Sequence, residues 1–442
     1  MRFSFLLLTT FLSLSPGFLN AIEYDLDTII NLAEERNKDI QLAQAELKTA
    51  SALKLEAISS ALPSFEVNAG YNRNFRENIF YFEAPDFQTG EIRTQSFKTS
   101  FNNEYRLNAV LSQTIFSFDV GTAIQAANYY NKYTNYQYDT QRQAVIATVK
   151  KAFYQALLAQ KVLEVAKDSE GSAKENYENI SIRYEAGAAS EFDKLQSEVR
   201  WQNSMPNTIR AKRNFDIALN NLKSLVEIPI TEEITLRGSI ENYPPVPEEL
   251  SFEEVIEQRP DYQSLQWEKK LQEKNVQVQY GNFLPSLEGS LTYAYTASSD
   301  KFKLERENDN VILGISLKVP IFSGGFNMAQ VRKAKAEVEK VKTRIAKADD
   351  NIQIDLQNIR LRIQEANQRI MAARKSVNVA ERTFELAQSQ AESGIITQVE
   401  LKENRVALDE AQLNYYTAIY DYLDAYFDWE RATGNVSSIS LN

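Results

Sequence analysis

The sequence predicts an α+β membrane protein built from two copies of one structural unit, each with two β-strands and one very long helix. Three observations support this fold class. Short landmarks recur in the same order in both halves, four segments alternate apolar and polar residues, and two segments keep a helical apolar period over many heptads. Gly and Pro are scarce, which fits long helices, whereas the 11% of aromatic residues exceeds what a plain coiled coil contains.

The repeat is visible as three pairs of landmarks. They are Ala61–Glu66 with Phe283–Glu288, Ile115–Ser117 with Ile321–Ser323, and Glu185–Gly187 with Glu392–Gly394. The two members of the second pair are separated by almost the same number of residues as those of the third pair. The separation in the first pair is larger, because a longer segment follows the first Leu-Pro-Ser. Chance similarity between helical stretches does not preserve such an order. Each copy is therefore predicted to contain a helix, two strands joined by a loop, a very long helix, a Gly turn and a shorter helix.

Four segments alternate with period two, which is the pattern of a β-strand. Their apolar positions are Phe65, Val67, Ala69 and Tyr71; Leu107, Ala109, Leu111 and Ile115; Leu287, Leu291, Tyr293 and Tyr295; and Val311, Leu313, Ile315, Leu317, Val319 and Ile321. About ten residues are enough for a tilted strand to span a bilayer. Four strands are too few to close a barrel, and lipid does not tolerate open strand edges, so membrane strands here require several protomers. An ordinary soluble four-stranded sheet has the same periodicity and remains the alternative.

The loops between paired strands differ in length. Residues 73–104 are rich in Phe, Asn and charge, whereas residues 297–310 are few and highly charged. Long loops of a membrane barrel normally face the outside of the cell. The aromatic residues of the first loop fit either an interfacial aromatic girdle or packed loop structure: Phe75, Phe80, Tyr81, Phe82 and Phe87.

The long helices have coiled-coil spacing. From Val331 every seventh residue up to Ala387 is apolar, and a second apolar row from Leu356 to Phe384 lies four residues further on. The segment from Phe326 to about Ser393 would form a helix roughly 100 Å long, at about 1.5 Å per residue. Its counterpart in the first copy runs from Thr122 to about Ala186. No globular domain needs helices of this length, so they are predicted to cross a space.

Both long helices are predicted to end in a tight turn. Gly187 and Gly394 suit the left-handed conformation that often terminates a helix. Ser190 and Thr397 follow at the position of an N-cap for the next helix. Each Gly turn is therefore the tip of a helical hairpin.

Residues 1–21 are predicted to be a cleavable secretory signal, because Arg2 precedes a short apolar stretch that ends at Leu19-Asn20-Ala21. No later apolar run is long enough for a spanning helix. The first repeat is assigned to residues 22–240, a linker to 241–250, and the second repeat with a C-terminal tail to 251–442. The Pro-containing stretch 227–250 is predicted to hold one short strand at Ile234–Leu236.

Composition excludes several classes of protein. The chain has no Cys and no His, which removes disulfide scaffolds, Cys-linked lipoproteins, His-based catalytic triads and the usual zinc or copper ligands. A formal net charge of −11 argues against nucleic acid and anionic head groups as partners. The pairs Asp349-Asp350 and Gly324-Gly325 fit a solvated helix face and a turn better than a catalytic or phosphate site. We therefore expect neither an enzyme nor a cofactor.

With these residues in place, the chain resembles the TolC-like family of outer-membrane efflux proteins over nearly its whole length after residue 21. The most specific matches are Arg259–Tyr262, Val319–Gly325 and the tips at Gly187–Asp193 and Gly394–Glu400. The resemblance implies a homotrimer in the lipid of the outer membrane, with a twelve-stranded β-barrel and a periplasmic α-helical coiled-coil barrel. It also implies an equatorial belt from the linker and the tail, a periplasmic adaptor and an inner-membrane pump. The function it implies is an exit duct for efflux or type I secretion.

The resemblance further implies a periplasmic gate. The acidic pair of the family falls on Glu400 and Glu403, which share a helix face, and the facing carboxylate falls on Asp193. Without the resemblance, acids in a first helical turn are simply favoured by the helix dipole. The Tyr and Arg that help lock the second tip in the family are Ala391 and Ile396 here. We therefore hypothesise that packing of Ile395 and Ile396 closes this end, and that Gly187, Ser190, Gly394 and Thr397 mark the tips where the adaptor docks.

A soluble periplasmic coiled-coil adaptor or structural protein is the alternative function. Such proteins have helical hairpins too, but they should lack paired strands with an apolar face of membrane length. The transported substrate is left open among drugs, lipids, polypeptides and metal ions. The absence of His and the presence of only four Met weaken a dedicated copper or silver route.

Overall fold

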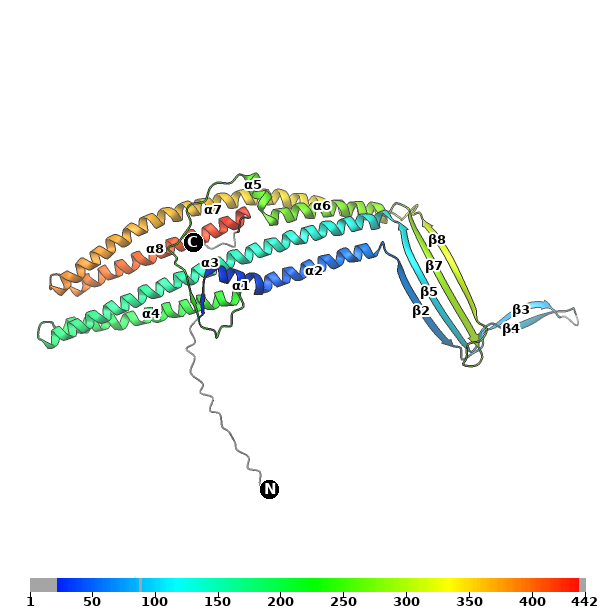
Figure 1. Ribbon diagram of the computed structural model, residues 1–442, viewed down its shortest axis with the longest axis horizontal. Coiled ribbons are helices and arrows are strands. Elements are labelled where there is room, and N and C mark those ends of the chain that lie inside the picture. The colour runs from blue at the N-terminus through cyan, green and yellow to red at the C-terminus, as the bar shows by residue number, and fades with distance from the viewer. Residues whose placement is uncertain (1–21, 87–89, 437–442) are drawn as a thin grey trace, which may run out of the picture. The chain divides into compact units, whose positions relative to one another are not determined.

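The computed structural model describes residues 22–86 and 90–436 (Figure 1). The predicted signal segment 1–21, Phe87 and the end of the C-terminal tail lie outside the described residues. Two compact units are present. One consists of residues 42–140 and 256–352, and the other of the preceding and following parts of the chain together with residues 141–255. Each unit thus contains parts of both copies of the repeat, and the long helices belong partly to one unit and partly to the other.

The unit of residues 42–140 and 256–352 contains the four-stranded antiparallel sheet. Its strands are β2 (Ser64–Arg73), β5 (Asn103–Phe116), β7 (Ser286–Ser299) and β8 (Asn308–Lys318), paired in that order. The four predicted strands are therefore confirmed. The pairing of β5 with β7 joins the two copies of the repeat, so β2 and β8 are left as the edges of the sheet.

The register of the sheet places the predicted apolar positions in rows across all four strands. One row is Phe65, Leu111, Leu291 and Leu313, and the next is Val67, Ala109, Tyr293 and Val311. The opposite face has polar rows, such as Asn68, Asn108, Ala294 and Asn310. Because successive side chains of a strand point to opposite faces, the sheet has one apolar and one largely polar face.

Two strand boundaries differ from those predicted. β8 ends at Lys318, so Val319 and Ile321 lie outside the strand, although their alternation suggested otherwise. Pro320 lacks the backbone N–H needed to continue the ladder, which accounts for the early end. β7 continues to Ser299, further than predicted, because residues 296–299 pair with β5.

The long loop 73–104 contains a β-hairpin that sequence reasoning did not predict. Its strands are β3 (Ile79–Pro85) and β4 (Ile92–Lys98). The ring of Phe97 lies 5.5 Å from that of Phe80 and 5.8 Å from that of Phe82, measured between centroids. These rings contact one another within the hairpin, yet Phe80 remains 54% and Phe75 91% exposed, so both the girdle and the packed loop stay possible.

Helices precede and follow the paired strands of each copy, and the repeated Leu-Pro-Ser separates the preceding helix from the first strand. Helix α2 (Lys38–Ser59) precedes β2, and α6 (Pro260–Gly281) precedes β7. After the second strand of each copy the chain enters α3 (Phe118–Glu185) or α7 (Phe326–Glu392). Helix α3 begins four residues before the predicted Thr122, with Ser117 beside its first turn. Within this unit Arg344 of α7 forms two hydrogen bonds, of 2.7 and 3.0 Å, with Glu268 of α6.

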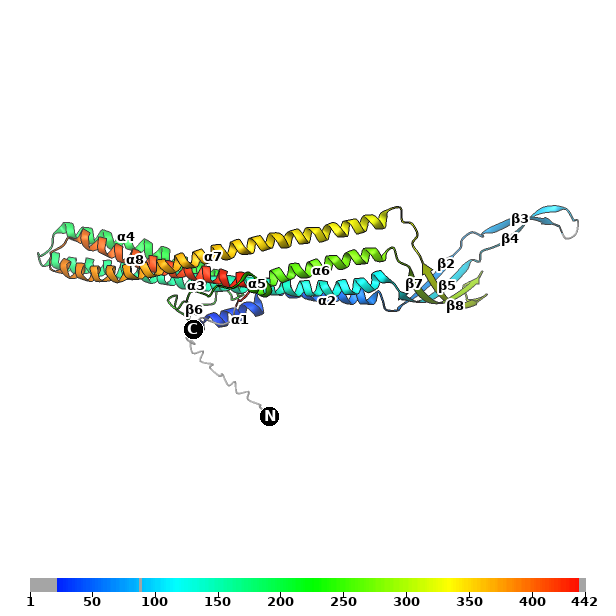
Figure 2. The same ribbon diagram turned by 90° about the horizontal axis from the view of Figure 1, so that it is seen from above.

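The other unit is a helical assembly. It contains α1 (Leu26–Arg36), the C-terminal parts of α3 and α7, α4 (Glu191–Leu225) and α8 (Gln398–Thr433), and the short α5 (Phe252–Gln258) begins in it. Strands β1 (Ile22–Tyr24) and β6 (Ile234–Leu236) pair in parallel, which confirms the short strand predicted there. Both ribbon views show α3 running beside α4 and α7 beside α8 as two hairpins (Figures 1 and 2).

The heptad rows of α7 are its buried face. Val331, Val338, Ile352, Ile359, Ala366 and Ala387 of the first row are buried, as are Ile363 and Ile370 of the second. The remaining positions of both rows are half-buried. The sequence period therefore identifies the packed face of the helix correctly, and burial of these side chains is the main force that holds so long a helix in place.

Charged side chains connect three helices of this unit. Lys150 of α3 and Glu430 of α8 form an ion pair of 2.8 Å, and their side chains are only 2% and 5% exposed. Next to it, Lys151 lies 2.8 Å from both Asp424 and Asp428 of α8. Arg362 of α7 contacts the same two carboxylates. Since removal of one partner would leave a buried charge unpaired, this network fixes how α3, α7 and α8 align.

The Pro-containing stretch 227–250 between the two copies also contacts α8. The Tyr422 hydroxyl donates a hydrogen bond to the Pro244 carbonyl (2.9 Å).

Candidate functional site at the hairpin tips

The two hairpin tips have the same backbone structure. Gly187 and Gly394 adopt φ angles of 72° and 73°, in the left-handed region. The N–H of each Gly donates three residues back, to Tyr184 (2.9 Å) or Ala391 (3.0 Å). The N–H of the next residue donates five residues back, to Arg183 (2.7 Å) or Gln390 (2.8 Å). This pair of hydrogen bonds is the Schellman motif, which requires the left-handed residue that Gly provides most readily.

Each tip then starts the returning helix with a side-chain cap. The Ser190 hydroxyl accepts a hydrogen bond from the N–H of Asp193 (3.1 Å), and the Thr397 hydroxyl accepts one from the N–H of Glu400 (3.3 Å). The Glu400 carboxylate accepts in turn from the backbone N–H of Thr397 (2.7 Å), which completes a capping box. The predicted helix ends and N-caps are therefore present at Gly187, Ser190, Gly394 and Thr397.

The three predicted gate acids have different surroundings. Asp193 is half-buried and accepts a hydrogen bond from the Ser190 hydroxyl (2.6 Å). Glu400 is exposed and belongs to the capping box, whereas Glu403 is exposed one turn further along α8. Within residues 22–86 and 90–436, none of the three forms an ion pair. Their negative charge is therefore uncompensated by a basic side chain in the chain itself.

The hydrogen bonds at Thr397 affect the titration of Glu400. Donation by the Thr397 backbone N–H, and then by its hydroxyl, lowers the pKa of Glu400. The folded pKa thus lies below that of the unfolded chain. The stabilisation is complete above the unfolded pKa and is lost as pH falls through the folded value. At neutral pH the carboxylate is ionised and its capping bonds are intact.

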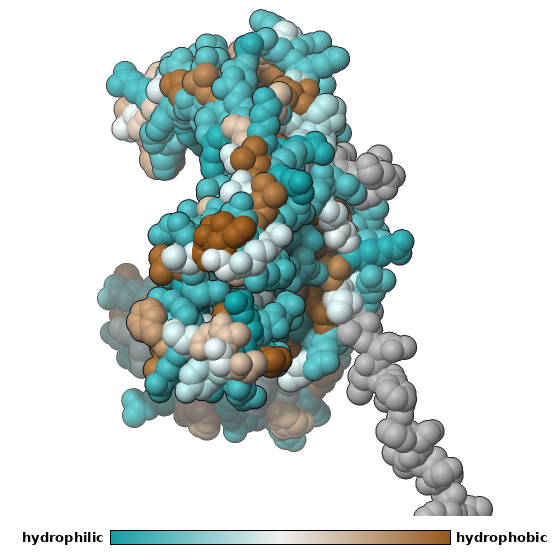
Figure 3. Space-filling view, turned by 90° about the vertical axis from the view of Figure 1, so that its left-hand side faces the viewer, coloured by the Kyte–Doolittle hydropathy of each residue, from teal (hydrophilic) through white to brown (hydrophobic). Residues whose placement is uncertain are grey.

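Apolar side chains are exposed at both tips. Ile182, Phe192 and Leu195 are exposed at the α3–α4 tip, and Ile395 and Val399 at the α7–α8 tip. Ile396 is half-buried, and Ala391 is buried. Figure 3 views the molecule from the tip end, where brown hydrophobic residues are scattered among teal hydrophilic ones.

Polar contacts join the two hairpins behind the tips. The Asn176 side chain donates to Gln398 (2.8 Å), Arg405 donates to the Ser172 hydroxyl (3.2 Å), and the Ser169 hydroxyl donates to Asp409 (2.7 Å). In each contact one residue comes from α3 and the other from α8. Sequence reasoning missed all three, since nothing in either helix alone indicates which polar residues meet across the hairpins.

No described helix has a stretch that is both long and apolar enough to cross a membrane. Over the same residues, no cluster of acidic side chains is arranged to hold a metal ion.

Comparison with known proteins identifies the family. Residues 29–226 and 252–435 match the family of outer membrane efflux proteins. Because the match extends over most of the chain, the protein belongs to this family. The family consists of outer-membrane exit ducts of efflux and secretion systems and is not a class of enzymes.

Two curated relatives and one solved structure illustrate the similarity. The alkaline protease secretion protein AprF of Pseudomonas aeruginosa is 25% identical over 51% of this chain, which spans about half (47%) of that relative. The outer membrane protein TolC of Vibrio cholerae is 23% identical over 74% of this chain and 72% of its own length. The Campylobacter jejuni CmeC outer membrane channel superposes with a TM-score of 0.76 and 21% identity, over 93% of this chain and 85% of that one.

The capping box at Thr397 should stabilise the α7–α8 tip. Replacement of Thr397 by Ala removes the hydroxyl acceptor and should cost about 1 kcal/mol, the typical value for an N-cap. Amide hydrogen exchange at residues 398–401 should accelerate. Thr383→Ala is the matched control, because its hydroxyl bonds only to the Val379 carbonyl within the helix (2.8 Å). Equal changes at the tip in both variants would show that the cap has no special role.

Proposed function

We propose that three copies of this chain form the outer-membrane exit duct of a tripartite export system. The observation that carries this proposal is the four-stranded sheet, which has an exposed apolar face and two open edges. Leu313 and Ile315 of β8 are 77% and 70% exposed, and Phe65 of β2 is 68% exposed. Exposed apolar surface of this kind marks a face that contacts another protein or a membrane.

A bilayer places strict demands on this sheet. In hydrocarbon every backbone N–H and C=O must have a partner within the protein. The outward ladder groups of β2 and β8 lack one within the described chain, because each of these strands has a single neighbour. Pairing of β2 with β8 of the next protomer satisfies both edges at once. Three copies then give a closed barrel of twelve strands with the apolar rows facing lipid.

The helices would form the periplasmic part of the duct. The buried heptad rows and the ion pairs among α3, α7 and α8 would make each hairpin a rigid part of the wall of the duct. At the tips, Gly187, Ser190, Gly394 and Thr397 set sharp turns, beside which Phe192 and Ile395 are exposed. Exposed apolar groups on a firm turn suit docking of a periplasmic adaptor, which would connect the duct to an inner-membrane pump.

The tips would also hold the gate. In a trimer, Asp193, Glu400 and Glu403 each occur three times around the axis, and rings of carboxylates attract cations and repel anions. Ile395 and Ile396 lie beside them in the turn and would close the opening by apolar packing. The duct itself would be a passive conduit for efflux or for protein secretion; the relatives named for protease secretion support the second use.

A charge on the apolar face of the sheet should prevent assembly. Leu313→Arg places a guanidinium at a lipid-facing position, where such a change costs about 2–4 kcal/mol at the bilayer midplane. Heat-resistant trimers in outer-membrane extracts should decrease strongly. Ile312→Arg is the matched control, since Ile312 is the adjacent residue on the other face and is also exposed. Release of the unchanged protein by osmotic shock would contradict the proposal and favour a soluble periplasmic protein.

The apolar closure of the tip should depend on Ile396. Ile396→Asp adds three charges to a trimer at the narrow end, and their repulsion should raise the channel conductance in planar bilayers severalfold. Ile209→Asp is the control, because Ile209 is exposed on α4 away from the tip. Conductance of Ile396→Asp channels equal to that of the parent would rule out packing at this residue as the lock.

A further inference from the structure

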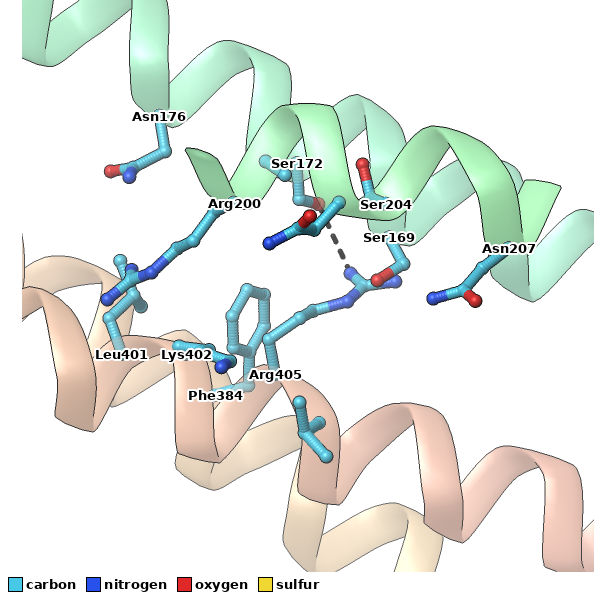
Figure 4. A pocket seen from close by; sticks show the side chains of 13 residues that line it. Ser169, Ser172, Asn176, Arg200, Ser204, Asn207, Phe384, Leu401, Lys402 and Arg405 are labelled. Atoms are coloured by element: carbon cyan, nitrogen blue, oxygen red, sulfur yellow. Dashed lines mark hydrogen bonds between the residues drawn. The ribbon is translucent and has the colours of Figure 1, made fainter. Parts of the chain in front are cut away.

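A pocket of about 320 Å³ lies between the two hairpins, some turns behind the tips. It is lined by residues of α3, α4, α7 and α8, all from one chain and from the same compact unit. Its existence therefore does not depend on oligomerisation. Figure 4 shows the Arg200 side chain of α4 and the Arg405 side chain of α8 extending into the space between the hairpins.

The lining of this pocket is cationic. Arg200, Lys402 and Arg405 line it, and none of the lining residues is acidic. Arg405 is neutralised from outside the pocket, since its Nε lies 2.8 Å from a carboxylate oxygen of Asp409. Arg200 and Lys402, by contrast, form no ion pair within the described part of the chain. The pocket thus has an excess of positive charge in a chain whose net charge is −11.

Arg200 is the group that most needs a partner. Its only hydrogen bond among the described residues is a long one, 3.4 Å, to the Gln398 side-chain oxygen. That oxygen already accepts a shorter bond from Asn176 (2.8 Å). Burial is the resolved cause that lowers the pKa of Arg200, with no carboxylate to oppose it. A partly buried guanidinium with most of its five N–H groups unused is a strong donor for an anion.

The remaining walls add hydrogen-bonding groups and an apolar surface. Asn203, Asn207 and Ser172 supply polar atoms, whereas Phe384, Leu401 and Val406 are apolar. The Arg405 guanidinium lies over the Phe384 ring, 5.3 Å from its centroid, which holds both side chains in place. A pocket of this size that combines charged and polar groups with an apolar wall can hold a small molecule.

We propose that this pocket binds a small organic anion, with its carboxylate or phosphate group at Arg200 and Lys402 and its apolar body against Phe384. Such a ligand would contact α4 through Arg200 and α8 through Lys402. It would therefore add a link between the two hairpins beside the polar contacts of α3 with α8 and the long contact from Arg200 to Gln398.

The test is calorimetric titration of the purified full-length chain in detergent with phenyl phosphate, phenol and inorganic phosphate. Phenyl phosphate should bind most tightly, because only it offers both the charge and the ring. Arg200→Gln should weaken its binding at least tenfold, since a charge-assisted hydrogen bond contributes about 1.5–3 kcal/mol and about 1.4 kcal/mol is a factor of ten. Lys402→Gln, at an exposed position, should weaken it less.

Arg210→Gln is the matched control, because Arg210 is exposed on the same helix and does not line the pocket. Its affinity for phenyl phosphate should equal that of the parent. Three results would overturn the proposal: no binding of phenyl phosphate, equal binding of phenol, or equal losses in Arg200→Gln and Arg210→Gln. Equal binding of inorganic phosphate would overturn the part assigned to Phe384. Circular dichroism of each variant establishes that it is folded.

Discussion

The structure depends on one constraint: the backbone groups at the outer edges of β2 and β8 must find partners while the apolar rows of the sheet are buried. Within one chain the sheet ends at these two strands. The constraint explains why the repeat has two strands per copy and why β5 pairs with β7, since that pairing makes one continuous sheet from both copies. Burial of the apolar face in lipid and pairing of the edges between protomers satisfy it together. A monomer satisfies neither.

The helical part meets a different requirement, which is to keep long helices in a fixed alignment. The apolar side chains at the heptad positions stabilise the helices by their burial. They do not determine which helix packs against which, or at what position along its axis. The buried pair Lys150–Glu430 and the shared carboxylates Asp424 and Asp428 add that specificity, because a helix shifted along its axis would separate them. At the tips the chain uses backbone geometry instead. The two turns agree in their backbone hydrogen bonds, and their sequences share the Gly, the Glu two residues before it and a hydroxyl residue three residues after it.

Much of this architecture could be predicted from the sequence because it depends on local periodicity and turn chemistry. The strands, the packed face of α7, the left-handed Gly residues and the N-caps all follow from residues close together in the chain. The β3–β4 hairpin was not predicted, because charged and polar residues interrupt the apolar alternation of its two strands. The aromatic rings of Phe80, Phe82 and Phe97 meet only once the two strands pair. The contacts behind the tips also escaped, because Asn176 and Gln398 come from different copies and meet only in the folded unit. The acids of the tips could be located but not their role, since acids are favoured in a first helical turn in any case and Glu400 also completes a capping box.

Cross-linking between edge strands tests the trimeric barrel most directly. The chain has no Cys, so introduced thiols report only on each other. Asn68→Cys on β2 can be combined in turn with Asn308→Cys, Asn310→Cys or Ile312→Cys on β8, all of which lie on the same face of the sheet. Oxidation in intact outer membranes should give covalent trimers for at least one pair, and none for the single variants. Monomers alone for every pair would contradict the pairing of β2 with β8 of a neighbouring protomer.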